Sequence, residues 1–355
     1  MEQVADIVAE REKLRIVTLK RFAFIGSSIV ASVLLIGYSL TVGTYDISVT
    51  DVYKALFNYF IYEKFDVSDD VMLVVNRIRA PRVLMAFAGG MVLAIGGCIT
   101  QTVLRNSLAT PYTLGVSSGA GFGAALAILF GIALLPGVYG IILNAFLFSL
   151  IPAGVVIIAS KRRNITPTTM VLCGVAISYI FSASNTIFQF FGEANAVKSV
   201  VFWMVGDLNS IKLSDLPFAF AATLLAFVAT MLIARDLNIL KMGDDTAKSL
   251  GVNAEALRTR SIVIACFTTA AIVSFTGSIG FICLLAPHIS RIFVGGEMTY
   301  LVPASAFFGS CLLLMADLVA KTIIAPIMLP VGAITALIGG PLLVFLLLRK
   351  SSTTL

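Results

Sequence analysis

Long stretches without charged side chains divide the sequence into predicted helices. The stretches that lack Asp, Glu, Lys and Arg cover residues 22–45, 83–104, 106–160, 164–192, 216–234, 261–290, 298–316 and 322–348. A helix of about 20 apolar residues, with a rise of roughly 1.5 Å per residue, crosses the hydrocarbon core of a bilayer. Each stretch is long enough for at least one crossing, so the pattern predicts an all-α, polytopic membrane protein.

The longest stretch, 106–160, is too long for a single crossing. The Pro136-Gly137 pair interrupts it, because proline removes a backbone donor and the two residues together favour a turn. We therefore expect two helices here, over about 114–132 and 138–160.

The stretch 261–290 decides between nine and ten spans. A turn within 277–280 gives two short spans and places more of the 25 Lys and Arg residues on the cytoplasmic side than a single crossing does. The positive-inside rule therefore favours about ten spans in the cell membrane, with both termini in the cytoplasm. The expected organisation is a cytoplasmic segment 1–21, a single transmembrane domain 22–349 and a cytoplasmic tail 350–355.

Two extracytoplasmic segments are long enough to fold. The segment 44–78 has apolar residues at helical spacing over 50–62, which predicts a short interfacial helix. The segment 192–215 carries the only tryptophan, Trp203, a residue type enriched at membrane interfaces.

The composition agrees with a membrane protein. Hydrophobic residues make up 59% of the chain and charged residues only 12%, and the mean hydropathy is +1.00. A soluble domain carries about twice that charged share, so a disordered chain and an ordinary soluble enzyme are excluded. The net charge of +6 comes from basic residues between apolar runs, so nucleic-acid binding is not expected.

The sequence offers no metal or cofactor site. All five cysteines lie in apolar runs, none forms a Cys-x-x-Cys pair, and His288 is the only histidine. We interpret the cysteines as free, packed thiols. Because no Gly-x-x-x-x-Gly-Lys-Ser/Thr loop occurs, the chain cannot cradle ATP in the usual manner. Active transport would draw its energy from a partner subunit or from an ion gradient.

Polar residues form one stripe on the fifth predicted span, over about 166–191. The stripe recurs at i, i+4, i+7 and i+11 and consists of Ser178, Ser182, Asn185 and Gln189. Such groups are costly in hydrocarbon unless they meet water or another helix. The stripe is a candidate lining for a translocation path, and interhelical hydrogen bonding is the structural alternative.

Small residues recur every four positions in two other spans. The two sets are Ala86, Gly90 and Ala94, and Gly115, Gly119 and Gly123. Such ridges let helix backbones approach closely, so we interpret them as packing surfaces.

Asp317 is the only acidic residue inside a predicted span. Lys321 lies one helical turn later and can partly neutralise it. Asp317 leaves open a second hypothesis, an ion-gradient-driven secondary transporter that uses this carboxylate. A membrane-embedded enzyme would need a convergent nucleophile or metal ligands, and the sequence offers none.

Four sequence blocks, in order, carry a family resemblance. They are Arg79-Ala-Pro-Arg82 with the glycine-rich run 88–97 and Gln101, then 105–120, then 242–252, and finally 277–291 followed by 316–321 and 329–341. With these blocks the chain, from about residue 77 to 349, resembles the FecCD-type permease subunits of binding-protein-dependent ABC importers for iron–siderophores, haem and vitamin B12.

The resemblance implies a type II importer permease that catalyses no reaction itself. It implies two cytoplasmic ATPase subunits, an extracytoplasmic substrate-binding protein and a second permease, either a copy of this chain or a paralogue, all assembled in membrane lipid. The favoured substrate is a ferric siderophore, with haem or a cobalamin-type chelate as alternatives.

The resemblance also assigns roles to particular residues. The cytoplasmic loop at about 238–257 would couple to the ATPase, with its centre at Gly243, Asp244, Ala247, Leu250 and Gly251. Within the loop we expect helical pieces over 238–250 and 252–258, broken at Gly251. Arg79, Arg82 and Lys321 would dock the binding protein, although Lys321 replaces the family's arginine and loses its bidentate fork.

Overall fold

The computed structural model describes residues 2–43, 45–62, 64–160 and 166–351, and every regular element within them is a helix. The α-helices are α1 (Glu2–Thr41), α2 (Val49–Phe60), α3 (Asp69–Leu73), α4 (Ala80–Val103), α5 (Val116–Phe130), α6 (Val138–Ser160), α7 (Pro167–Phe191), α8 (Ala194–Val205), α9 (Leu216–Leu232), α10 (Ala234–Leu240), α11 (Asp244–Ser249), α12 (Ala254–Thr276), α13 (Ile282–Val294), α14 (Met298–Thr322) and α15 (Val331–Ser351). A π-helical turn, η1 (Val74–Arg79), leads into α4, and two 3₁₀ turns, η2 (Pro111–Leu114) and η3 (Leu213–Asp215), precede α5 and α9.

The predicted spans are present as helices. Seven described helical segments are long and apolar enough to cross a membrane. Each contains one of the helices α1, α4, α6, α7, α9, α12 and α14. The shorter apolar helices α5, α13 and α15 occupy the other expected spans. The predicted break in 261–290 is confirmed, because α12 ends at Thr276 and α13 begins at Ile282, with Gly277 at a φ of 66°.

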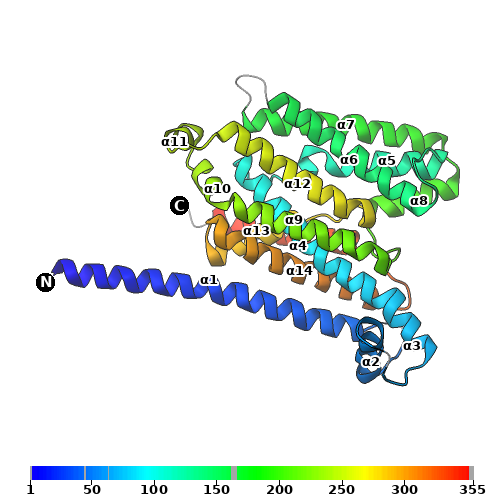
Figure 1. Ribbon diagram of the computed structural model, residues 1–355. Coiled ribbons are helices and arrows are strands. Elements are labelled where there is room, and N and C mark those ends of the chain that lie inside the picture. The colour runs from blue at the N-terminus through cyan, green and yellow to red at the C-terminus, as the bar shows by residue number, and fades with distance from the viewer. Residues whose placement is uncertain (1, 44, 63, 161–165, 352–355) are drawn as a thin grey trace.

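The centre of the molecule is α4, which is almost wholly buried along its length. It packs against α9, α12, α13 and α14 (Figure 1). Gly90 lies so close to α14 that an added Cβ would come within 2.6 Å of the Gly309 carbonyl oxygen. The small-residue ridge on α4 is therefore a packing surface, as predicted.

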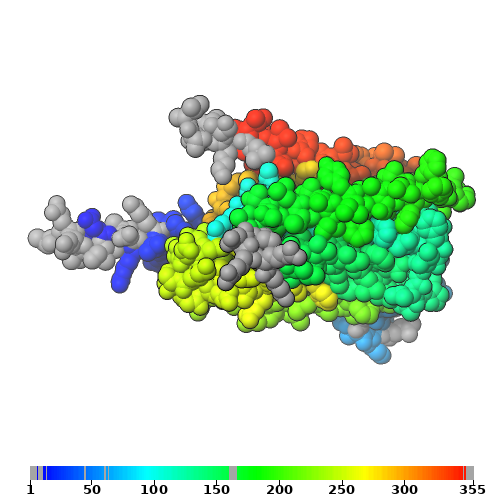
Figure 2. Space-filling view, turned by 90° about the horizontal axis from the view of Figure 1, so that it is seen from above, coloured from blue at the N-terminus to red at the C-terminus, as the bar shows by residue number. Residues whose placement is uncertain are grey.

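A second layer is formed by α5, α6 and α7. Gly119 and Gly123 bring the backbone of α5 against that of α6, where an added Cβ would come within 2.5 and 2.4 Å of the carbonyl oxygens of Phe148 and Asn144. By contrast, α7 and α8 lie at the margin and form part of the molecular surface (Figure 2).

The two ends of the bundle differ in their connections. Figure 1 shows α10 and α11 at one end of the bundle, the end beyond which the start of α1 extends and toward which α15 runs, and α2 and α3 at the other. We name these, after the topology expected from the sequence, the coupling end and the outer end. The expected helix over 50–62 is present as α2. The basic run 161–163 and residues 352–355 of the expected tail lie outside the described residues.

The first helix extends beyond the apolar run 22–45 back to Glu2, because the charged residues that precede the run are themselves good helix formers. One expectation needs correction. In the coupling loop, the expected piece over 238–250 is split into α10 and α11, since Gly243 adopts a φ of 125°. The expected piece over 252–258 is the first part of α12. The predicted break at Gly251, with a φ of 81°, is present.

Candidate functional site

The polar stripe of α7 follows the edge of the buried face of that helix. Asn185 is buried, Ser178 and Gln189 are half-buried, and Ser182 is exposed. The Ser178 hydroxyl donates a hydrogen bond to the carbonyl of Gly174, one turn earlier in its own helix, at 2.8 Å. The four residues therefore share a helix face but not one environment.

Asn185 is the unusual member of the stripe. Its side chain is 2% exposed, and neither polar atom of its amide has a hydrogen-bond partner among the described residues. Gly121 of α5 lies against this amide, so that a Cβ there would approach Nδ2 to 3.4 Å and the Met204 side chain of α8 equally closely. An unpaired buried amide costs roughly 1–3 kcal/mol, so stability of this fold does not explain an asparagine here.

A buried charge cluster joins several segments at the outer end. Arg82 of α4 donates from Nε to Oδ1 of Asp317 on α14 at 2.5 Å, and from Nη1 to the side chain of Asn209 in the loop after α8. Lys321 lies 3.8 Å from Asp317 but donates instead to the carbonyl and hydroxyl of Ser39 on α1, at 2.6 and 2.8 Å. Asp317 is thus held by two cations and is not an isolated intramembrane acid.

Arg79 lies beside this cluster and has a different partner set. Its guanidinium donates to the carbonyls of Leu40 and Thr41, at 3.1 and 2.9 Å, and to that of Tyr45. These carbonyls lie at the end of α1, where no further helical turn can satisfy them, so Arg79 caps that helix. Gly43 permits the approach, since a Cβ there would meet the guanidinium at 2.9 Å.

The three expected docking residues are therefore internal in this conformation. Arg79, Arg82 and Lys321 are 5%, 3% and 4% exposed, and each is engaged by internal partners. Arg77 and Lys212 are exposed cations at the same end of the bundle. A docking role for the buried three stays a prediction, and it requires them to exchange these partners for those of another protein.

At the coupling end, one carboxylate ties three segments together. Asp244 of α11 accepts from Arg105, which follows α4, and from Arg258 of α12 at 3.0 and 3.1 Å. Arg105 also donates to the carbonyl of Leu240 in α10 at 2.9 Å. Partial burial raises the pKa of Asp244, but the hydrogen bonds and charges of the two arginines outweigh it and leave the pKa below its usual value.

Of the remaining expected coupling residues, some are buried against the bundle and others lie on the surface. Ala247 is fully buried and holds α11 against the bundle, whereas Leu250 and the neighbouring Met242 are exposed apolar side chains. Gly243 and Gly251 flank α11 with positive φ angles. Arg105 and Arg258 were not predicted from the sequence as partners of Asp244. The excess of basic residues around this loop was the signal available.

No described set of three or more His, Cys, Asp and Glu side chains is arranged to hold a metal ion. Four of the cysteine thiols are buried, and all five are free.

Comparisons with known proteins agree with this architecture. The FecCD transport family matches residues 29–349. An ABC transporter permease protein of Methanocaldococcus jannaschii is 39% identical over 95% of this chain and 97% of its own length. The hemin transport system permease protein HmuU of Yersinia pestis is 35% identical over 77% of this chain and 82% of its own.

Solved structures extend the comparison to three dimensions. An ABC transporter described as being of the metal-chelate type, in an inward-facing conformation, is 29% identical and covers 92% of this chain and 98% of its own, with a TM-score of 0.80. PsaBC from Streptococcus pneumoniae, at 15% identity and a TM-score of 0.51, shares the fold alone. Since the family match covers residues 29–349 of a chain of 355, the chain belongs to the FecCD transport family.

Proposed function

We propose that this chain is the permease subunit of an ABC importer that moves a metal chelate into the cytoplasm, with a ferric siderophore as the first candidate cargo. Haem and cobalamin-type chelates are the alternatives, since relatives are named as hemin and cobalamin permeases. The observation that carries the proposal is the family match over residues 29–349. The chain itself is non-catalytic, and ATP is hydrolysed by two partner subunits.

The coupling end is the proposed contact with the ATPase subunits. The exposed apolar side chains of Met242 and Leu250 suit insertion into a groove of a partner protein. Asp244 links their segment to α4 and α12 through Arg105 and Arg258, so movement of α11 would be transmitted to the spans.

The margin formed by α7 is the proposed translocation path and the contact with a second permease, either a copy or a paralogue. Most of α7 is not covered by this chain, which suits a helix that meets another subunit. Ser178, Ser182, Asn185 and Gln189 would give the path a polar, uncharged lining suited to a large chelate. We expect Asn185→Leu to raise the melting temperature, because it removes an unpaired amide, and to slow transport.

The outer end is the proposed docking surface for the substrate-binding protein. If acidic side chains of that protein replace the internal partners of Arg79 and Arg82, reversing both charges weakens docking. Since these residues also support the fold, Arg77→Glu on the exposed surface is the comparison variant. Docking that is normal in a folded Arg79→Glu/Arg82→Glu protein would remove the assignment.

A tagged purification in mild detergent, with ATPase activity assayed on the eluate, tests the function directly. We expect an ATPase to co-purify and to be lost when residues 243–251 are replaced by a flexible linker, while circular dichroism shows that the protein stays helical. A well-folded protein without an ATPase, which still moves solute down an imposed ion gradient, would contradict the proposal and favour the secondary transporter.

A further inference from the structure

An apolar groove runs along the membrane-facing side of the bundle. It has a volume of about 540 Å³ and lies between α6, α9 and α12. Its walls are almost entirely apolar and include Leu143, Phe146, Phe218, Leu225 and Phe267. Phe218, Leu225 and Phe267 are 64%, 48% and 41% exposed on helices apolar enough to span a membrane, so the groove opens on the lateral surface of the bundle.

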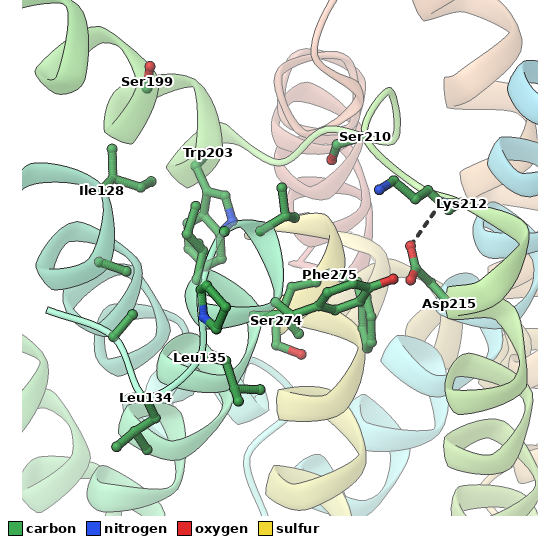
Figure 3. A pocket seen from close by; sticks show the side chains of 18 of the residues that line it. Ile128, Leu134, Leu135, Ser199, Trp203, Ser210, Lys212, Asp215, Ser274 and Phe275 are labelled. Atoms are coloured by element: carbon green, nitrogen blue, oxygen red, sulfur yellow. Dashed lines mark hydrogen bonds between the residues drawn. The ribbon is translucent and has the colours of Figure 1, made fainter. Parts of the chain in front are cut away.

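Toward the outer end, the groove adjoins a second cavity of about 900 Å³ with polar residues on its rim. Leu135, Tyr139 and Phe275 line both cavities, so the two are continuous. Of these two cavities, Trp203 and Lys212 line the outer one alone. Trp203 also lines a neighbouring pocket of about 380 Å³, and Lys212 another of about 920 Å³. Figure 3 shows Trp203 and Leu135 on one side of it and Lys212 on the other, with Phe275 between them.

The ammonium group of Lys212 is available to a ligand in the outer cavity. Its side chain is exposed, Nζ lies 6.0 Å from the ring centroid of Tyr139, and no ion pair between described residues involves it. Asp215 also lines this cavity, but its carboxylate accepts the backbone N–H of Lys212 at 2.8 Å and the hydroxyl of Ser214 at 3.5 Å. Asp215 therefore stabilises the start of α9, and no described carboxylate forms an ion pair with the ammonium.

We propose that the two cavities together bind one anionic phospholipid, with an acyl chain in the groove and the headgroup phosphate at Lys212. A tryptophan, a tyrosine and a lysine at the end of an apolar groove match the transition from acyl chain to headgroup at a membrane surface. A free phosphate ion would leave the groove unused, and a zwitterionic phospholipid, whose phosphate charge is offset by its own headgroup cation, would gain less from Lys212. The site includes none of the residues proposed for the path, for docking or for coupling, and its existence does not depend on the transport function.

The only tryptophan of the chain makes the site directly observable, because Trp203 lines the outer cavity. The full chain is placed in nanodiscs of phosphatidylcholine that contain a small fraction of either phosphatidylglycerol or phosphatidylcholine with brominated acyl chains. We expect brominated phosphatidylglycerol to quench Trp203 fluorescence at a lower mole fraction than brominated phosphatidylcholine. Unbrominated phosphatidylglycerol should relieve the quenching, and inorganic phosphate should not.

Two variants test the two halves of the site. Lys212→Gln should reduce the preference for phosphatidylglycerol roughly fivefold, which is the contribution that one basic residue makes to the affinity for an anionic headgroup. Lys198→Gln is the matched control, because Lys198 is also exposed at this end, with its Nζ 6.0 Å from the Phe202 ring, but lines neither cavity. Ala221→Phe, which fills the groove from an exposed position, should weaken quenching by both brominated lipids.

The proposal has clear contrary outcomes. Equal quenching of the wild-type chain by the two brominated lipids would mean ordinary contact with surrounding lipid and would overturn it, without reliance on any variant. An equal loss of preference in Lys212→Gln and Lys198→Gln would overturn the headgroup assignment. Unchanged quenching in Ala221→Phe would overturn the placement of the acyl chain.

Discussion

Each end of the bundle contains one carboxylate that faces two cations, but the two carboxylates differ in how far they are buried. At the outer end Asp317 faces two cations, Arg82 and Lys321, and at the coupling end Asp244 faces two others. In both places one carboxylate joins segments far apart in the chain. Asp317 is fully buried, however, whereas the side chain of Asp244 is 39% exposed.

The difference in burial indicates different structural roles for the two carboxylates. A buried charge pair is costly to break, because each partner would remain desolvated without compensation. A pair in contact with water is screened, worth little and easily rearranged. The outer cluster is therefore suited to fix α1, α4 and α14 to one another, and the cluster of Asp244 is suited to a segment that changes its contacts.

The largest expected effect is that of Asp317→Ala. It leaves Arg82 buried without its carboxylate, and we expect a loss of about 3–5 kcal/mol in the free energy of unfolding. The measurement is thermal or denaturant unfolding of the purified protein. A loss below about 1 kcal/mol would mean that the buried cluster does not differ from an exposed one, and the comparison would fail.

A double variant separates the charge from the packing. In Arg82→Met/Asp317→Leu both members of the closest pair are removed together. Lys321 loses its carboxylate but keeps its hydrogen bonds to Ser39, so we expect part of the stability lost in Asp317→Ala to return. Nη2 of Arg82 and Oδ2 of Asp317 have no hydrogen-bond partner among the described residues, so the pair is incompletely satisfied and replaceable. If the folded double variant also retains ATP-dependent transport, Asp317 is not a proton carrier, and the secondary-transport hypothesis is excluded.

Arg79 provides an intermediate case, a buried cation that binds carbonyls and not a carboxylate. Arg79→Met leaves the last carbonyls of α1 without their donor but strands no charge. We expect a loss of about 1–3 kcal/mol, smaller than for Asp317→Ala. Hydrogen exchange should show the loosening concentrated at the end of α1, and a uniform change along the chain would count against the capping role.

The sequence predicts the local features of this architecture better than its long-range contacts. Pro136-Gly137 and the turn at Gly277 are visible locally, because proline and glycine act on their own backbone. The pairing of Arg82 with Asp317 joins residues 235 positions apart, and no periodicity reports it. An acid within a span signals that a counter-charge exists, but several basic residues are equally plausible from sequence. The same limit applies to Asn185, whose stripe is predictable but whose unpaired burial depends on α5 and α8.

At the coupling end, we expect Asp244→Asn to lower the stability of the protein only slightly but to weaken strongly the coupling between substrate and ATPase activity. Exposed pairs contribute at most about 1 kcal/mol, so we expect a small shift in melting temperature. The link between α11, α4 and α12 is weakened, so ATPase stimulation by substrate should fall more than stability does. Asp245→Asn, next along α11 and in no ion pair between described residues, is the matched control. Equal effects of the two substitutions would remove the special role of Asp244.

The smallest expected effect is a pH dependence confined to the coupling end. The pKa of Asp244 is lowered in the folded protein, so its contribution to stability is fully present above the unfolded value of about 3.9. The contribution is lost as the pH falls through the lower, folded pKa, where protonation removes the pairs with Arg105 and Arg258.

The measurable quantity is the difference in melting temperature between the wild-type protein and Asp244→Asn, because other carboxylates affect both proteins equally. We expect this difference to be constant near neutral pH, to shrink below about pH 4 and to shrink also in 1 M salt, where the screening length falls to about 3 Å. A difference that persists in acid and in high salt would mean that Asp244 behaves like a buried charge, and the contrast between the two ends would disappear.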